Sequence, residues 1–131
     1  MLLFLLNIKE ENHNKMIIPF EEFERAVMAK LLEEENSINR ILREQYKNSE
    51  IISREFTGAG FFTKLKIPPH IPLVNEPVDY GYGNLWCCIN DKEFLHGFVL
   101  FIKDGVMICL EGFTCADSWP EIITSFEFMP N

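Results

Sequence analysis

The residues best suited to nucleophilic catalysis lie in the second half of the 131-residue chain. Cys88 precedes His96 by eight residues, and Asp91 lies between them, where it would orient the imidazole. A thiol nucleophile needs a base within hydrogen-bond reach and an oxyanion site. The chain has none of the local motifs that accompany cysteine nucleophiles, so we expect no catalytic residue. A small hydrolase that uses Cys88 and His96 is kept as an alternative.

Carboxylates offer a second kind of acid–base chemistry. Glu93, Glu111 and Glu121 are expected at strand ends, where two carboxylates would form a general acid and base. Because 20 of the 131 residues are acidic, such proximity carries little information. Paired carboxylates therefore belong to the same hydrolase alternative. A third alternative is a small-ligand-binding domain with its pocket between helix and sheet.

The cysteines favour neither a metal site nor disulfides. Cys87 and Cys88 are adjacent and would point to opposite faces of a strand, no C-x-x-C motif occurs, and the three histidines lack ligand spacing with the thiols. The glycine pairs at 58–60 and 81–83 lack the further glycines of a phosphate-binding loop. We predict free thiols, no metal and no cofactor. The reducing cytoplasm is the expected location, since residues 1–6 are apolar but too few for a secretion signal.

Composition excludes several classes of function. The 12 Lys and Arg residues against 20 Asp and Glu give a net charge of −8, which phosphate backbones repel, so we expect no nucleic-acid binding. No apolar run approaches the roughly 20 residues of a membrane-spanning helix, so we expect no membrane insertion. Hydrophobic residues make up 47% of the chain, which excludes disorder of the whole chain and indicates one globular domain.

Charge is distributed unevenly along the chain. After Lys103 there are five acidic residues and no Lys, Arg or His, and residues 68–90 contain two acids and no Lys or Arg. Aromatic anchors within a field of one sign are typical of a protein interface. The predicted partner-binding residues are Asp79, Tyr80, Tyr82, Glu111, Phe113, Asp117, Trp119 and Glu121. The alternative is that Phe113 and Trp119 only cover the edge of a sheet.

The elements that position these residues follow from hydrophobic spacing. Residues 20–46 repeat apolar side chains every three or four positions and are predicted to be helical, bent or split near Asn36. Strands are predicted at 51–56, 61–67, 84–89, 97–102, 106–110 and 124–128, with a long loop at 68–84. Asp104-Gly105 joins two runs that are apolar on both faces, which predicts a hairpin in the middle of the sheet.

The expected fold class is α+β, with an N-terminal helix or helix pair packed on one face of an antiparallel meander of about five or six strands. Residues 1–15 are expected to be an extension or a short strand, and 16–131 are expected to form a single domain. Twelve Phe residues exceed what one core of this size is expected to hide. A homodimer through a sheet edge or an apolar patch is therefore an open alternative.

Four stretches together resemble a widespread group of small bacterial proteins. They are the runs 54–63 (REFTGAGFFT), 96–105 (HGFVLFIKDG) and 110–114 (LEGFT), followed by Trp119-Pro120. Some members are associated with polymorphic-toxin and contact-dependent growth inhibition loci, where small acidic proteins act as immunity proteins. The resemblance covers about 50–129, more loosely from 20, and implies no catalytic residues. The stretch before Met16 and the Cys87-Cys88 pair depart from the group's pattern.

The hypothesis that joins these observations is a cytoplasmic, non-enzymatic immunity protein. Its partner would be a basic protein toxin domain, such as a nuclease, bound through charge complementarity.

Overall fold

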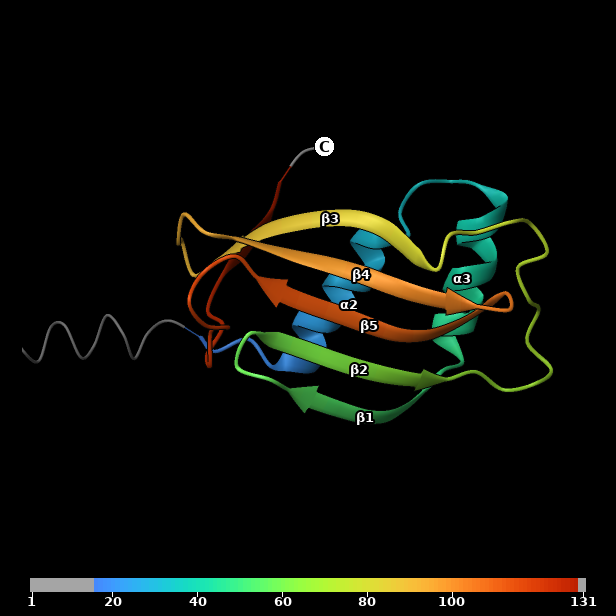
Figure 1. Ribbon diagram of the computed structural model, residues 1–131, viewed down its shortest axis with the longest axis horizontal. Coiled ribbons are helices and arrows are strands. Elements are labelled where there is room, and N and C mark those ends of the chain that lie inside the picture. The colour runs from blue at the N-terminus through green and yellow to red at the C-terminus, as the bar shows by residue number, and fades with distance from the viewer. Residues whose placement is uncertain (1–15, 130–131) are drawn as a thin grey trace, which may run out of the picture.

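The computed structural model describes residues 16–129, and the predicted extension at 1–15 lies outside the described residues. Two helices, α2 (Phe20–Leu31) and α3 (Ser37–Lys47), precede the strands in the chain. They lie behind a single antiparallel sheet in the view of Figure 1 and cover one of its faces. The predicted α+β class, with helices packed on one sheet face, is confirmed.

The helical region is split at the predicted position. Helix α2 follows Pro19, whose fixed φ suits a helix start, and carries Glu21 and Glu22 in its first turn, where acidic groups face the positive end of the helix dipole. Helix α3 is capped by Asn36, whose side chain accepts a hydrogen bond from the Asn39 amide. Helix α2 ends at Leu31, and the Asn36 cap starts the next helix.

The sheet consists of β1 (Glu50–Phe56), β2 (Gly60–Lys66), β3 (Gly81–Ile89), β4 (Leu95–Lys103), β5 (Val106–Thr114) and β6 (Phe126–Phe128). Their order in space is β1-β2-β5-β4-β3-β6. The β4–β5 hairpin is central, as its apolar faces predict, and its turn residues Asp104 and Gly105 have φ of 53° and 77°. The order departs from a simple meander because β2 pairs with β5, and the loop after β2 carries the chain to β3.

One buried side chain holds that connecting loop. The Gln45 amide donates to the carbonyls of Pro72 (3.0 Å) and Gly105 (2.9 Å) and accepts from the Met107 amide (3.0 Å). All of its polar atoms are therefore satisfied inside the protein, as burial of an amide requires. The helix, the loop and the central hairpin are tied together at this point.

The core lies between the helices and the sheet. Phe23 of α2 packs against an aromatic cluster in which ring centroids of Phe61, Phe98 and Trp119 lie 5.3–6.4 Å apart. Glu24 is buried beside them, where its carboxylate accepts hydrogen bonds from Arg54 of β1 (2.8 and 3.2 Å) and from the Thr63 hydroxyl of β2 (2.5 Å). These contacts hold α2 on the sheet.

No helix of the described chain covers the opposite surface of the sheet, which we call the open face (Figure 1). Side chains alternate between the two faces of a strand, so the neighbours of the buried strand residues point outward here. The open face is formed by Glu50, Glu55, Phe62, Lys64, Lys66, Trp86, Cys88, Leu95, Val99, Phe101, Lys103, Cys109, Glu111, Phe113 and Glu127.

Candidate functional site

Three connecting segments meet at one end of the sheet, and we call residues 57–59, 90–94 and 115–125 the loop end. The Trp119 amide donates to the Gly58 carbonyl (2.7 Å), and the Cys115 amide donates to the Leu95 carbonyl (3.1 Å). The Asn90 side chain donates to the Ile122 carbonyl (2.6 Å) and accepts from the Thr124 amide (2.7 Å). Segments far apart in the sequence are thereby held side by side.

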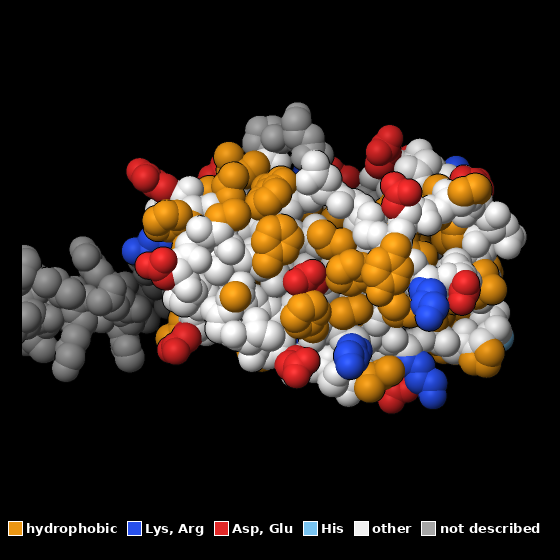
Figure 2. All heavy atoms as spheres, in the orientation of Figure 1, with side chains coloured by type: hydrophobic (Ala, Val, Ile, Leu, Met, Phe, Trp, Pro, Cys, Tyr) orange, Lys and Arg blue, Asp and Glu red, His pale blue; other side chains and the backbone are white. Residues whose placement is uncertain are grey.

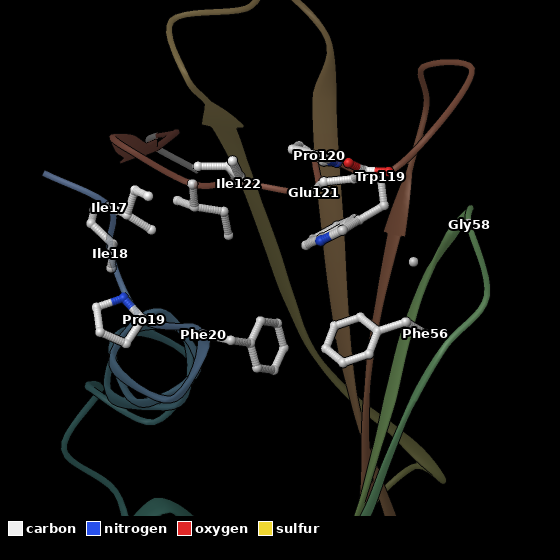
Figure 3. Close-up of a pocket in the computed structure, with 12 residues that line it drawn as sticks. Ile17, Ile18, Pro19, Phe20, Phe56, Gly58, Trp119, Pro120, Glu121 and Ile122 are labelled. Carbon is white, nitrogen blue, oxygen red and sulfur yellow. The ribbon is translucent and has the colours of Figure 1, made fainter. Parts of the chain in front are cut away.

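A groove of about 540 Å³ opens at the loop end, between the start of α2, the β1–β2 turn and residues 119–123 (Figure 3). Its lining is mainly apolar, and three of the lining residues are strongly exposed: Ile17 (62%), Phe56 (57%) and Ile122 (53%). The Phe20 and Phe56 rings meet edge-on across the groove, with centroids 5.0 Å apart. We call this the apolar groove.

Acidic residues are frequent at the loop end and at the start of α2, and Glu121 lines the groove itself. Segments 90–94 and 115–125 carry four exposed acids and one cation, Lys92. The first turn of α2 adds two further exposed carboxylates. The acids are Glu21, Glu22, Asp91, Glu93, Asp117 and Glu121. One cation, Arg54, lies over the Phe20 ring (5.7 Å) and 3.8 Å from Glu21. A concave apolar surface in a mainly acidic region fits a partner that brings an apolar side chain and basic groups.

The structure distributes the eight predicted partner-binding residues among three places. Asp117 and Glu121 are exposed at the loop end, and Glu121 lines the groove. Trp119 is only 7% exposed, and its ring packs edge-on against Phe61 (5.3 Å) and His96 (5.1 Å). For Trp119 the covering role weighed as the alternative is therefore the one observed, although its outer edge forms part of the groove wall.

Glu111 and Phe113 project from β5 on the open face. The Phe113 ring lies over Gly97, where a Cβ atom would stand 2.3 Å from the ring, and meets Trp86 edge-on at 5.5 Å. The ring can pack against the backbone here because Gly97 has no side chain. Both residues are half-buried among neighbouring strands and lie outside the apolar groove.

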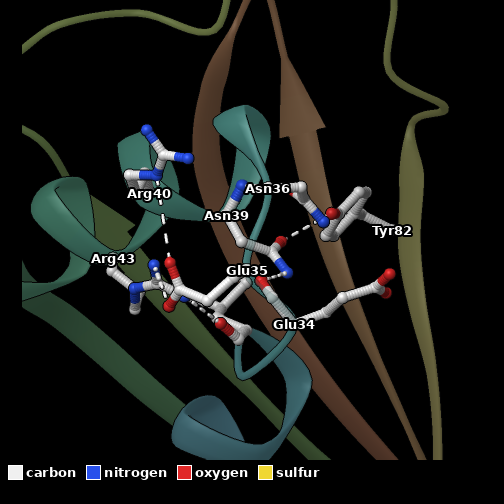
Figure 4. A network of polar contacts seen from close by, with 8 residues as sticks. Glu34, Glu35, Asn36, Asn39, Arg40, Arg43 and Tyr82 are labelled. Atoms are coloured by element: carbon white, nitrogen blue, oxygen red, sulfur yellow. Dashed lines mark hydrogen bonds and ion pairs between the residues drawn. The ribbon is translucent and has the colours of Figure 1, made fainter.

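Asp79, Tyr80 and Tyr82 lie near the start of β3, at the end of the sheet opposite the loop end. The Tyr80 ring contacts Phe101 with centroids 5.0 Å apart. The Tyr82 hydroxyl instead donates to the Asn39 side chain (2.6 Å), and burial raises its pKa, with the nearby Glu34 charge adding to the shift. Tyr82 thus belongs to a network that fixes the α2–α3 connection (Figure 4). The eight residues do not form one continuous surface.

The sheet separates the two groups of the cysteine hydrolase alternative. His96 pairs with Cys87 and is 2% exposed on the helix side, whereas Cys88 points to the open face. Burial lowers the pKa of His96 and raises that of the Cys87 thiol to about 12. The thiol next to the imidazole is therefore held in its unreactive neutral form, because only a thiolate is a good nucleophile.

The carboxylates of the hydrolase alternative are not brought together either. Glu111 stands in mid-strand, paired with Val99, rather than at a strand end. Glu93 lies in the β3–β4 turn and Glu121 in the segment after β5. Within residues 16–129, no cluster of three His, Cys, Asp or Glu side chains has the geometry of a metal site. In the same range, no helix has the length and apolar character needed to cross a membrane.

The groove residues Ile17, Phe56 and Ile122 were missed by sequence reasoning. Each comes from a different segment, and the sequence around it does not distinguish it from other apolar residues. The sequence signal was that Ile17 borders the helix start and Phe56 borders the glycine turn. The Ile18 amide to Ile123 carbonyl bond (2.7 Å) holds the helix start near residues 119–123, and the Trp119 amide to Gly58 carbonyl bond (2.7 Å) holds the glycine turn there. In comparisons with protein-family models, curated proteins and solved structures, nothing was found that matches this chain.

Proposed function

We propose that this protein is a non-enzymatic binding module of the immunity type, which neutralises a basic toxin domain, such as a nuclease, in the cytoplasm. The observation that carries the proposal is the pairing of the apolar groove with the acidic residues of the loop end. The resemblance to small bacterial proteins from toxin loci points in the same direction.

The two features would contribute differently to binding. The carboxylates at 91, 93, 117 and 121 steer a positively charged domain toward the loop end and raise the association rate. The groove then accepts an apolar side chain from the partner, and burial of such an anchor provides most of the affinity. A nuclease needs a positive surface to hold its substrate, so a carboxylate-rich inhibitor that occupies this surface competes with the phosphate backbone.

The proposal predicts that the gene directly upstream encodes a large secreted protein with a basic C-terminal domain, and the test uses that domain. Co-expression with the wild-type protein is expected to restore growth, and calorimetry at low salt is expected to detect a one-to-one complex. Replacing Asp117→Lys and Glu121→Lys together should weaken binding at least about tenfold and abolish the rescue.

The matched control is the pair Glu44→Lys and Glu50→Lys, both exposed and outside the loop end. Each double variant changes the net charge by +4, since each reversal adds two units. Wild-type binding by the control supports the loop end as the interface. Equal weakening by both variants, or by neither, would contradict the proposal.

A further inference from the structure

The open face carries an apolar band across its middle. Side chains of four neighbouring strands contribute, and Figure 2 shows hydrophobic groups gathered over the central strands of this face. The band consists of Phe62, Trp86, Val99, Phe101, Cys109 and Phe113. Aromatic side chains gathered on one uncovered surface indicate a contact site, because monomeric proteins seldom expose large apolar patches.

The charged residues of the open face are sorted along the strand direction. Glu111 lies in one cross-strand row with Phe62 and Val99, and Glu55 extends this row on β1. Lys64 lies one row further from the loop end, opposite Cys109. Beyond it come Lys66 and Lys103, while Glu127 lies on the loop-end side, opposite Cys88. Glu50 pairs with Lys66 and lies in the same outer row. Thus three of the four acids occupy the loop-end half of the face, and the three lysines, with Glu50, occupy the other.

The edges of the sheet are poor sites for pairing with a second sheet. Edge strand β1 is interrupted by a register shift between Ile51 and Ser53, and the other edge strand, β6, has three residues. Irregular or very short edge strands prevent sheets from adding to one another. The apolar band, rather than an edge of the sheet, is therefore the surface through which two copies would associate.

We propose that the open face binds the open face of a second copy of this chain, about a two-fold axis that runs across the strands between the Glu111 row and the Lys64 row. Rotation about such an axis reverses the strand direction, so the acidic half of one copy meets the lysine half of the other. Lys64 of each copy then lies against Glu111 and Glu55 of the other. An axis along the strands would instead place acids on acids, so the charge pattern selects the first arrangement.

The same rotation places Trp86 and Phe113 opposite the outer lysines of the second copy, where ammonium groups over aromatic faces are favourable. Two sheets stacked in this way form a sandwich with an apolar centre. The apolar groove is lined by residues of α2, the β1–β2 turn and 119–123, and no open-face residue lines it. The dimer thus leaves both grooves accessible, and this inference does not depend on the proposed function.

The test is the mass of the full chain by sedimentation velocity and light scattering. Wild-type protein at about 50 μM is expected at twice the mass of the chain, as for a dissociation constant in the micromolar range. Glu111→Lys alone and Lys64→Glu alone should each raise the dimer dissociation constant at least about tenfold, because each places like charges across the interface.

The deciding measurement mixes the two single variants in equal amounts. In a mixed dimer, the new lysine of one copy faces the new glutamate of the other, so the mixture should form dimers with near wild-type affinity. A variant that was weak only because its own fold was damaged would not be rescued in this way. A monomeric wild type, dimers that persist in either single variant, or a folded mixture that stays monomeric would each overturn the proposal. Glu44→Lys, on α3, serves as the control that should remain dimeric.

Discussion

The loop end and the open face both expose apolar side chains, but they differ in the sign of the charges beside them. At the loop end, residues 90–94 and 115–125 carry four exposed acids and one lysine. On the open face, three acids occupy the loop-end half, and three lysines, with the one acid Glu50, occupy the other half. A surface of one sign repels a second copy of itself and favours a partner of the opposite sign. A surface with both signs in separate halves can pair with itself. The arrangement of charge, more than the apolar area, separates the two binding roles that we propose.

The largest expected effect comes from the ion pair that holds α2, one wall of the groove. Replacing Arg54→Ala leaves the buried Glu24 carboxylate without its guanidinium and should lower the free energy of unfolding by about 3 kcal/mol. Chemical denaturation followed by circular dichroism measures this. Glu24→Leu combined with Arg54→Met removes both charges and should recover most of the loss. If the double variant is as unstable as Arg54→Ala, the loss comes from packing rather than from the stranded charge.

The second effect compares the two faces of the sheet through matched glycines. An added Cβ would stand 2.2 Å from the Phe61 ring at Gly112 and 2.3 Å from the Phe113 ring at Gly97. Phe61 is fully buried and has no room to move, whereas Phe113 is half-buried on the open face. Gly112→Ala should therefore destabilise the protein by about 3 kcal/mol and Gly97→Ala by about 1 kcal/mol.

Equal losses of stability in the two alanine variants would show that Phe113 is as rigidly held as a core residue. Because Gly97→Ala shifts Phe113 within the apolar band, it should also weaken the proposed dimer, which light scattering would detect.

A third effect separates the two surfaces by their response to salt. Raising NaCl from 50 to 500 mM should weaken binding of a basic partner at the loop end about tenfold, because exposed charges of one sign act over distances that salt screens. The dimer should weaken less, since its apolar band is indifferent to screening. Calorimetry and sedimentation over the same salt series give the two dependences. A dimer more salt-sensitive than the partner complex would reverse the distinction drawn between the surfaces.

The smallest effect concerns pH and is confined to the helix side of the sheet. Among the described residues, Nδ1 of the buried His96 is the one buried polar side-chain atom without a hydrogen-bond partner, and burial lowers the pKa of His96 below 6.5. His96 therefore takes up a proton more readily in the unfolded chain than in the folded protein. Its contribution to the free energy of unfolding is fully present above pH 6.5 and is lost as the pH falls. Between pH 7 and pH 6 the free energy of unfolding should drop by at most about 0.7 kcal/mol.

Denaturation curves of the wild type and of His96→Phe over this pH range measure the contribution. The variant should lose the dependence, and His70→Gln, at an exposed position, should keep it. An unchanged slope in His96→Phe would assign the pH response to other groups. Dimerisation should respond little, since His96 points away from the open face.

Much of the fold was predictable because its signals are local. The split of the helical region near Asn36 and the Asp104-Gly105 turn depend on a few adjacent residues, and both are found where they were predicted. The opposite orientations of Cys87 and Cys88 follow from the pleat of a strand. The candidate site was less predictable. Trp119 lies in the stretch after Lys103 that lacks cations, which predicts an interface, but the core it covers comes from distant strands.

The sequence by itself determined the class of the fold, the position of the central hairpin, the free thiols and the negative charge, because each depends on composition or on spacing within one segment. Only the tertiary structure decided that residues 17, 56 and 122 form one groove, and that Glu111 and Lys64 lie in neighbouring rows of an uncovered sheet face. The physical reason is that strand order and register bring distant residues together. Here the connection from β2 to β3 passes over two strand positions, and side-chain spacing along the chain carries no record of that crossing.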